Sequence, residues 1–284
     1  MLKTTLSLIV YLTLHLSLTA QADIIIQKGD KIAFLGDSIT AAGAKPGGYC
    51  HLIIETLNQK GLEVTPKYAG ISGHKSNQML ARLENDVLSH KPQWMTLSCG
   101  VNDVWHGARG VALEDYKKNI TSIVDQAQAA GIKVILLTST MIKEDASNDL
   151  NQKLKGYNEF IVQLSKEKNC LLADLNGIMQ ETIKTLEKNE KGNTVTSDGV
   201  HMNSMGNMMM AKGILAVMGF TPDELKTIEA KWADIPNTNQ IRLNVMLSHA
   251  ELQKLQSAAK AQEKSVQQLF DEALQSKKAE LIGK

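Results

Sequence analysis

The sequence predicts an α/β protein in which helices cover both faces of a parallel sheet. Short apolar runs alternate along the chain with amphipathic helical patterns. Most of these runs are apolar on both faces, as is typical of strands in a covered parallel sheet. The composition, 43% hydrophobic and 21% charged over 284 residues, is that of a globular protein. It fits one α/β domain of about 200 residues with an appendage.

The expected elements follow one another at regular intervals. Five runs are the expected strands: 31–35, 64–69, Trp94–Ser98, 134–138 and 170–175. Six patterns with a 3.6-residue period are the expected helices: 49–60, 76 to about 88, 113–130, a helix that ends near 168, one that ends near 188, and 203–218. Ser76 is expected to cap the second of these helices. A short helix follows Thr221-Pro222 and leads to Trp232.

The first 22 residues predict a secretory signal and not a part of the fold. Lys3 supplies a positive charge, residues 6–18 are largely apolar, and Ala20-Gln21-Ala22 has the small-x-small cleavage pattern. A membrane anchor is the alternative, but the apolar run is short for a span of about 20 residues. We therefore expect cleavage after Ala22, a periplasmic or secreted protein, and no stable membrane insertion after cleavage.

Charge and cysteine content exclude several classes of partner. The net charge is +1 and no segment is dense in Lys or Arg, so no nucleic-acid partner is expected. The chain has three cysteines, Cys50, Cys99 and Cys170, and none has the spacing of a metal site. The chain also has no dinucleotide GxGxxG motif and no Walker loop, so no nucleotide cofactor is expected. The odd number leaves at least one thiol unpaired, and whether two of the three form a disulfide stays open.

The segment 236–284 differs from the rest. Ile241, Leu243, Val245 and Leu247 alternate with less apolar residues, which predicts a half-buried strand. Two capping boxes, Ser248-x-x-Glu251 and Ser265-x-x-Gln268, each open a helix. This strand-helix-helix appendage weakly resembles a ribbon-helix-helix unit, which pairs its strands across a dimer. It is too small to bury enough surface alone, so we expect docking on the domain 23–235 or a homodimer.

The first strand ends in a candidate nucleophile. The run 32–35 leads directly into Gly36-Asp37-Ser38, and ligands of open α/β sheets bind beyond the carboxyl ends of the strands. Acyl transfer through Ser38 needs a base and a group that orients this base. His201 is the candidate base, and Asp198, three residues earlier, can fix its tautomer.

Donors for an oxyanion follow the next two strands. Gly73 can bring a backbone N–H close to a ligand because it lacks a Cβ. Asn102 can offer its side-chain amide, and the Ser38 N–H makes a third donor. Taken singly, each of these motifs could be a turn or a helix cap. Their order, each at the end of a strand or its equivalent, favours a catalytic site.

Together these motifs resemble the four conserved blocks of the SGNH, or GDSL-type, hydrolases. The blocks are Gly36-Asp37-Ser38-Ile39, Gly73 in the segment GISGHKS, Gly100-Val101-Asn102-Asp103 and Asp198-Gly199-Val200-His201. Ile39 stands where the name-giving motif has Leu. The resemblance covers about 30–218 and implies a three-layer α/β/α, flavodoxin-like fold and a metal-independent esterase. It also implies a triad of Ser38, Asp198 and His201, with Gly73 and Asn102 completing the oxyanion hole.

The resemblance implies several substrate classes, because such families include esterases, lysophospholipases, thioesterases and carbohydrate O-deacetylases. The segment 41–48 is small and rich in glycine, and no long apolar lid is visible. This favours short-acyl esters, such as acetyl groups on a glycan. A lysophospholipase or thioesterase acting on lipid is the alternative. From another class, a catalytically silent carbohydrate-binding protein on the same fold is also possible.

Three further residues are candidates for the rim of the substrate site. Trp105 could stack on a sugar or simply pack, and His106 could touch substrate or remain solvated. Asp37 is expected to support the nucleophile turn through hydrogen bonds and not to act as a base.

Overall fold

A computed structural model describes residues 23–186, 194–232, 235, 245–281 and 283. These residues fall into two compact units that divide after Asn239. Each unit is described by itself. The predicted signal segment, 1–22, lies outside the described residues.

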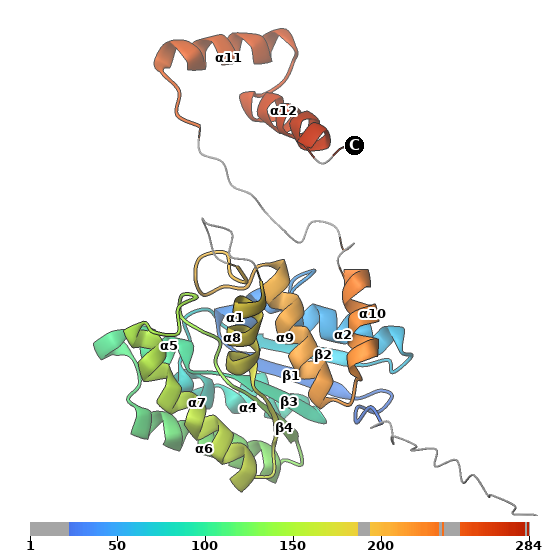
Figure 1. Cartoon of the computed structure of the whole chain (residues 1–284), viewed down its shortest axis with the longest axis vertical. Coiled ribbons are helices and arrows are strands. Elements are labelled where there is room, and N and C mark those ends of the chain that lie inside the picture. The colour runs from blue at the N-terminus through green and yellow to red at the C-terminus, as the bar shows by residue number, and fades with distance from the viewer. Residues whose placement is uncertain (1–22, 187–193, 233–234, 236–244, 282, 284) are drawn as a thin grey trace, which may run out of the picture. The chain divides into compact units, whose positions relative to one another are not determined.

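The first unit is built on a five-stranded parallel sheet (Figure 1). The strands are β1 (Lys31–Gly36), β2 (Thr65–Gly70), β3 (Trp94–Ser98), β4 (Lys133–Leu137) and β5 (Leu171–Ala173). Their order across the sheet is β2-β1-β3-β4-β5, the flavodoxin-like order. All pairs are parallel, so the predicted α/β fold with a parallel sheet is confirmed.

The register of β1 decides where the site can form. Gly36 pairs with Gly70 of β2, and Leu35 pairs with Leu97 of β3. The carboxyl ends of these three strands are therefore nearly level. Because β1 is flanked by β2 on one side and β3 on the other, the chain reverses its direction across the sheet here, and crevices form at such switch points.

Two layers of helices cover the sheet (Figure 1). One layer holds α1 (Ser38–Gly43), α2 (Tyr49–Gln59), α8 (Leu175–Thr185), α9 (Ser204–Val217) and α10 (Pro222–Trp232). The other holds α3 (Ser76–Ala81), α4 (Leu83–Asp86), α5 (Val101–Trp105), α6 (Leu113–Ala129) and α7 (Asp149–Glu167). Two 3₁₀ turns, Leu88–His90 and Gly107–Arg109, complete the set. Residues 32–35 of β1 are fully buried between the layers, which explains why this strand reads as a continuous apolar run.

The expected helix 76–88 is wrong as a single element. The structure ends α3 at Ala81, because Arg82 leaves the helical conformation, with φ −107° and ψ 4°. The Arg82 guanidinium donates to the carbonyl oxygens of Gly36 at 2.8 Å and Ala69 at 2.9 Å. Contacts to two strand ends thus override the helical period of the sequence.

The residues after β1 also differ from the expectation of a turn and a loop. Ser38 begins α1, which takes in residues 41–43 of the expected glycine-rich loop. The helix lies against the sheet because two neighbours are glycines. A Cβ on Gly36 would lie 2.0 Å from Thr40 Oγ1, and one on Gly70 would lie 2.3 Å from Ala41 N.

The second unit contains α11 (His249–Ala261) and α12 (Val266–Leu281). Both predicted capping boxes are confirmed, since Ser248 N donates to Glu251 Oε2 at 2.8 Å and Ser265 N donates to Gln268 Oε1 at 2.7 Å. Most of the expected strand, 241–244, lies outside the described residues. Its described end, 245–247, belongs to no strand and is exposed.

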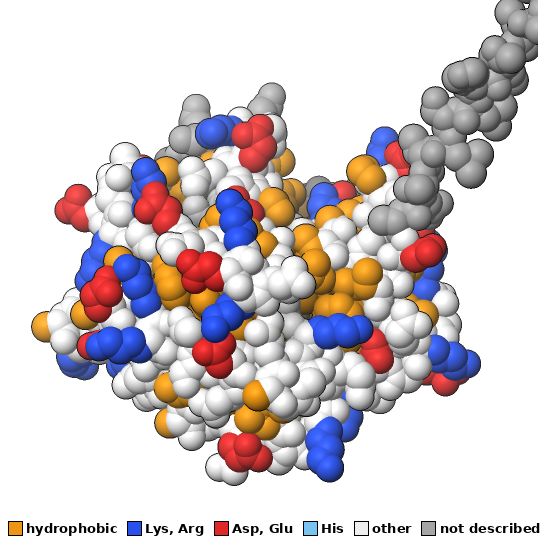
Figure 2. Space-filling view, turned by 90° about the horizontal axis from the view of Figure 1, so that it is seen from below, with side chains coloured by type: hydrophobic (Ala, Val, Ile, Leu, Met, Phe, Trp, Pro, Cys, Tyr) orange, Lys and Arg blue, Asp and Glu red, His pale blue; other side chains and the backbone are white. Residues whose placement is uncertain are grey.

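The surface of the first unit mixes charges of both signs. On the face in Figure 2, Lys and Arg alternate with Asp and Glu, and small groups of hydrophobic side chains lie between them. Within the described ranges, no helix has the length and apolar character that crossing a membrane would require.

Candidate active site

Ser38 is the first residue of α1, and one residue, Asp37, separates it from the end of β1 at Gly36. The Asp37 carboxylate caps this helix, because its Oδ1 accepts a hydrogen bond from Ile39 N at 2.9 Å. The cap and the two glycines described above fix the start of α1. They leave the Ser38 side chain at the carboxyl edge of the sheet.

His201 and Asp198 come from the segment between α8 and α9, and the structure brings both to Ser38. His201 Nε2 lies 2.9 Å from Ser38 Oγ, and His201 Nδ1 lies 2.7 Å from Asp198 Oδ2. The other carboxylate oxygen of Asp198 accepts from the backbone N–H groups of Val200 and His201, at 3.0 and 2.8 Å. The three side chains therefore form one continuous hydrogen-bonded chain.

The surroundings of Asp198 in this series of hydrogen bonds favour its ionised form. Burial raises the pKa of Asp198, but the hydrogen bonds from the His201 ring and from two backbone N–H groups outweigh it and hold the pKa below its usual value. Because an ionised carboxylate only accepts, the His201 proton lies on Nδ1. This leaves the Nε2 lone pair facing the Ser38 hydroxyl.

The expected oxyanion donors surround the same edge. Gly73 lies in an exposed turn after β2 and has φ +76°, a conformation that favours glycine. No hydrogen-bond partner for the N–H of Ser38 or Gly73 is found among the described residues. Asn102, in α5, is 8% exposed, and its Nδ2 donates to Asp37 Oδ2 and to His74 O, both at 3.2 Å. Two donors are thus open and the third is held by long bonds that a charged oxygen can displace.

Asp37 does not lie on an open rim, which corrects that part of the prediction. It is 2% exposed, and its carboxylate joins the cap of α1 to the Asn102 amide. Burial raises the pKa of Asp37 to about 6, although the Ile39 N–H and the nearby His201 oppose this effect. The expected support of the nucleophile turn by hydrogen bonds is what the structure shows.

Trp105 and His106 follow Asn102 on the same short helix and at its end. The Trp105 side chain is 43% exposed, and His106 is half-buried. Asn102 and Trp105 are three residues apart, so they share one face of α5. The indole is therefore available on the side of the helix that carries Asn102.

Sequence reasoning missed the residues that support these donors. Arg82 donates through Nε to the His74 ring at 3.2 Å, and the His74 carbonyl accepts from Asn102. Asp103, fully buried, accepts from the Ser76 backbone N–H and hydroxyl, at 3.0 and 2.6 Å. Ser76 is thus bound through its hydroxyl to Asp103 as the first residue of α3, in place of the expected cap. His74 and Ser76 lie inside the second motif and Asp103 inside the third, so of these residues only Arg82 carried no signal in the sequence.

None of the three thiols belongs to the hydrogen-bonded chain of Ser38, His201 and Asp198. Cys50, Cys99 and Cys170 are all free, so no disulfide joins any pair of them. Burial raises the pKa of the Cys50 and Cys99 thiols well above the usual value, which keeps both protonated and unreactive. Among the described residues, no three His, Cys, Asp or Glu side chains are grouped as a metal site would require.

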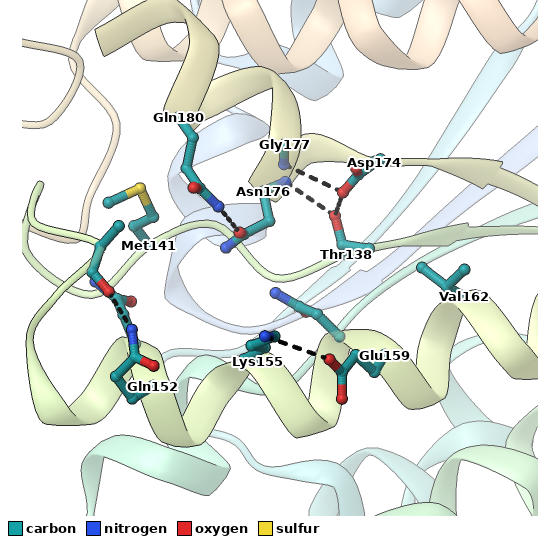
Figure 3. Close-up of a pocket in the computed structure, with 13 residues that line it drawn as sticks. Thr138, Met141, Gln152, Lys155, Glu159, Val162, Asp174, Asn176, Gly177 and Gln180 are labelled. Atoms are coloured by element: carbon teal, nitrogen blue, oxygen red, sulfur yellow. Dashed lines mark hydrogen bonds and ion pairs between the residues drawn. The ribbon is translucent and has the colours of Figure 1, made fainter. Parts of the chain in front are cut away.

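A separate pocket of about 520 Å³ lies between α7 and α8, at the carboxyl ends of β4 and β5 (Figure 3). Its polar groups largely pair with one another. Thr138 donates to Asp174 at 2.7 Å, and the Gln180 amide donates to Asn176 at 2.7 Å. None of the three residues in the hydrogen-bonded chain lines it, so this pocket is not part of the candidate active site.

A hydroxyl that donates to an imidazole, which is itself held by a carboxylate, defines a class of enzyme, the serine hydrolases. The chain belongs to the GDSL-like lipase/acylhydrolase family, whose family model matches residues 34–208. It is a serine hydrolase that acts on carboxylic esters. The family predicted from the four motifs is confirmed.

Two proteins that match over nearly their full length are described as acetylxylan esterases. The chain is 29% identical over 217 residues to an acetylxylan esterase of Geobacillus stearothermophilus, and the match covers 69% of this chain and 96% of that enzyme. A crystal structure of Axe2, an acetylxylan esterase from Geobacillus stearothermophilus, matches with a TM-score of 0.63 at 28% identity, covering 69% of this chain and 97% of that one. The acetyl xylan esterase AlAXEase matches with a TM-score of 0.61 at 35% identity, covering 66% and 98%.

A lipid-related enzyme matches over a shorter stretch. An Escherichia coli protein described as a thioesterase, protease and lysophospholipase is 30% identical over 109 residues. This match covers 38% of the chain and 50% of that protein.

Proposed function

We propose that this protein removes short acyl groups, above all acetyl, from hydroxyl groups of carbohydrate. The observation that carries the choice of substrate is the extent of the matches. The acetylxylan esterases match over 96–98% of their length, whereas the lipid-related enzyme matches over 50%. An ester hydrolase on this fold has the required chemistry in Ser38, His201 and Asp198.

In the first half of the proposed reaction, His201 Nε2 takes the proton of Ser38 as Oγ attacks the ester carbonyl. The 2.9 Å contact between these two atoms is the distance that this transfer needs. Asp198 stabilises the imidazolium that forms. The negative charge on the former carbonyl oxygen is accepted by the N–H groups of Ser38 and Gly73 and by the Asn102 amide.

The tetrahedral intermediate then collapses, and the sugar hydroxyl leaves with the proton from His201. Ser38 now carries the acyl group as an ester. In the second half, His201 takes a proton from a water that attacks this ester. Collapse of the second intermediate breaks the bond to Ser38 Oγ and releases the acid, and the proton that His201 took from the water passes to Ser38 Oγ.

Two features support a small acyl group and a sugar in this site. Residues 41–43 are part of α1, so the segment beside Ser38 is shorter than the sequence suggested and is no lid. The exposed Trp105 offers a flat apolar surface near Asn102, as sugar rings require. A thioesterase or lysophospholipase must also hold a long acyl chain, and a silent binding protein needs no hydrogen-bonded serine.

The acyl preference gives a direct test. With 4-nitrophenyl esters, kcat/KM should fall by at least about tenfold from acetate to octanoate, because a small site does not hold the longer chain. Acetate should be released from acetylated xylo-oligosaccharide by the wild type and not by Ser38→Ala. Equal kcat/KM values for acetate and octanoate would reject the short-acyl site. If the wild type hydrolyses neither the 4-nitrophenyl esters nor the acetylated xylo-oligosaccharide, the result favours the catalytically silent binding protein.

We also propose that the chain is exported, with a signal segment at 1–22 and a catalytic domain at 23–235. The support is the charge, the apolar run and the small-x-small pattern of the N-terminus. A periplasmic or secreted esterase would meet acetylated polysaccharide outside the cell.

The appendage 236–284 is proposed to join two copies of the chain. Of its described residues, only Ala259 is a buried hydrophobic side chain, whereas Leu252, Leu274 and Leu281 are 36%, 44% and 75% exposed. So small a unit with exposed leucines on both helices needs a further surface to cover them. A second copy supplies that surface, and the alternating residues 241–247 can then pair across the dimer.

Native mass spectrometry of the protein from its producing cells tests both proposals at once. We expect a dimer of chains that begin at Asp23, and a monomer when 240–284 is deleted. A mature chain that begins at Met1 would contradict export. A dimer that survives the deletion, or a monomeric full-length chain, would contradict the role of the appendage.

A further inference from the structure

The segment that carries Asp198 and His201 has little regular structure of its own. Between residues 194 and 203 the structure contains only an isolated antiparallel bridge between Thr196 and Met202. The side chains of Asp198 and His201 are 54% and 39% exposed. Val195 and Val200 anchor the segment in the core, at 0% and 2% exposed, but the exposed side chains of Asp198 and His201 are not packed there, so their alignment depends on hydrogen bonds.

Glu144 supplies four of those bonds from outside the segment. Its Oε1 accepts from the N–H groups of Val195 and Thr196, at 2.9 and 2.7 Å, and from the Thr196 hydroxyl at 2.7 Å. Its Oε2 accepts from Thr194 N at 2.5 Å. Thus one carboxylate holds three successive residues and ends its contacts two residues before Asp198.

Two more hydrogen bonds extend these contacts to the motif 198–201, which contains Asp198 and His201. Thr196 Oγ1 donates to Glu144 and accepts from Gly199 N at 3.1 Å. Beside Glu144, Lys143 N donates to Gly199 O at 2.6 Å. Gly199 is therefore held on both sides of its backbone, and it lies between Asp198 and His201 in the chain.

The loop that carries Glu144 is itself anchored to α7. Asn151 is 9% exposed, and its side chain accepts from Ile142 N at 2.8 Å and donates to the carbonyl oxygens of Ile142 and Asp145 at 2.8 and 2.7 Å. Residues 142–145 therefore link α7 to the segment 194–199, so the position of this segment depends on that of α7. The connection is continuous from a long helix of the scaffold to His201.

Charge suits Glu144 to this task. Burial raises its pKa, but the bonds from Thr196, Thr194 and Val195 together outweigh burial and hold the pKa below the usual value. The side chain is therefore ionised at neutral pH. An ionised carboxylate accepts N–H bonds at both oxygens, whereas a glutamine accepts only at its carbonyl oxygen, because its amide nitrogen is a donor.

We infer that Glu144 is a positioning residue of this esterase: it holds residues 194–199 so that Asp198 and His201 stay aligned on Ser38. The inference rests on the proposed roles of those three residues. It assigns to a carboxylate outside the four motifs a function that acts through His201 and not on the substrate.

Two variants and a matched control test the inference. Glu144→Ala removes all four bonds, and kcat should fall about 10²-fold with KM nearly unchanged, because misplaced catalytic groups slow the chemistry and not the binding. Glu144→Gln keeps one carbonyl oxygen but turns a donor towards a backbone N–H, so a loss of about tenfold is expected. Glu159→Gln, on α7 with its carboxylate 66% exposed, should behave as the wild type.

A spectroscopic readout separates positioning from a general loss of stability. The far-downfield ¹H NMR signal of the proton shared by His201 Nδ1 and Asp198 should be present in the wild type and in Glu159→Gln. It should be broadened or lost in Glu144→Ala, measured well below the unfolding temperature of each variant.

A folded Glu144→Ala enzyme with the wild-type kcat and an unchanged signal would overturn the inference. If Glu144→Ala does not fold, Glu144→Gln decides in the same way. Ser38→Ala, assayed beside them, distinguishes a failure of the proposed function from a failure of the role of Glu144. Activity in Ser38→Ala overturns the proposed function itself, whereas an inactive Ser38→Ala with a normal Glu144→Ala overturns only the role of Glu144.

Discussion

Replacement of Ser38 by alanine should lower kcat by roughly 10⁴–10⁶-fold, the loss expected when a nucleophile and its base act as one unit. His201→Ala should cost a similar factor, because the 2.9 Å contact from His201 Nε2 to Ser38 Oγ is the path by which the hydroxyl loses its proton. KM should change little in both variants, since neither side chain is needed to hold the sugar.

The double variant Ser38→Ala/His201→Ala makes the test specific. If the two side chains work only together, the double variant should be no slower than either single one. His249→Ala, at the exposed start of α11, is the histidine control and should match the wild type. Hydrolysis by Ser38→Ala at more than about a tenth of the wild-type rate would contradict the acyl-enzyme mechanism.

The second large effect concerns the oxyanion. Asn102→Ala should lower kcat by about 10²–10³-fold, the usual cost of one lost donor. The neighbouring exposed Asn77 on α3 is the matched control, and Asn77→Ala should leave kcat unchanged. An Asn102→Ala enzyme with a normal kcat would show that the amide serves only the bonds to Asp37 and His74.

Asp37→Asn tests the same oxyanion donor, because Asp37 accepts a hydrogen bond from the Asn102 amide. The variant presents an amide nitrogen where Oδ2 now accepts from Asn102, so the Asn102 amide loses its orientation and kcat should fall. The same variant should also change how the free energy of unfolding depends on pH. Because the folded pKa of Asp37 is raised to about 6, folding favours the protonated form, and the wild type should lose up to about 3 kcal/mol as pH rises from about 4 to above 6. That loss should be absent from Asp37→Asn in urea unfolding followed over the same pH range.

The sequence predicted the elements in which nearly every residue is buried among apolar neighbours. The strands that became β1, β3 and β4 are buried on both faces, so their apolar runs mark them clearly. It failed where a few side chains decide the backbone. The six residues of α1 are too few to show a period, and the helix after Ser76 is broken by Arg82, whose partner Gly36 lies 46 positions away.

The same distinction applies to the site. Ser38, Gly73 and Asn102 could be predicted because parallel strands place their carboxyl ends at one edge, which makes the residues after each strand neighbours. Glu144 could not be predicted, because its four bonds reach residues 50 to 52 positions later and no spacing in the chain marks them. Asp37 is a rim candidate in the sequence, whereas the fold buries it behind the nucleophile.

The separation of 163 positions between Ser38 and His201 also governs when, during synthesis of the chain, this chemistry can begin. A ribosome that adds about 5–20 residues per second produces the serine roughly 10–30 s before the histidine. All five strands leave the ribosome before Asp198 and His201 do. A nascent or prematurely ended chain therefore contains a serine without a base, and ester hydrolysis starts only once synthesis has passed the last turn before α9.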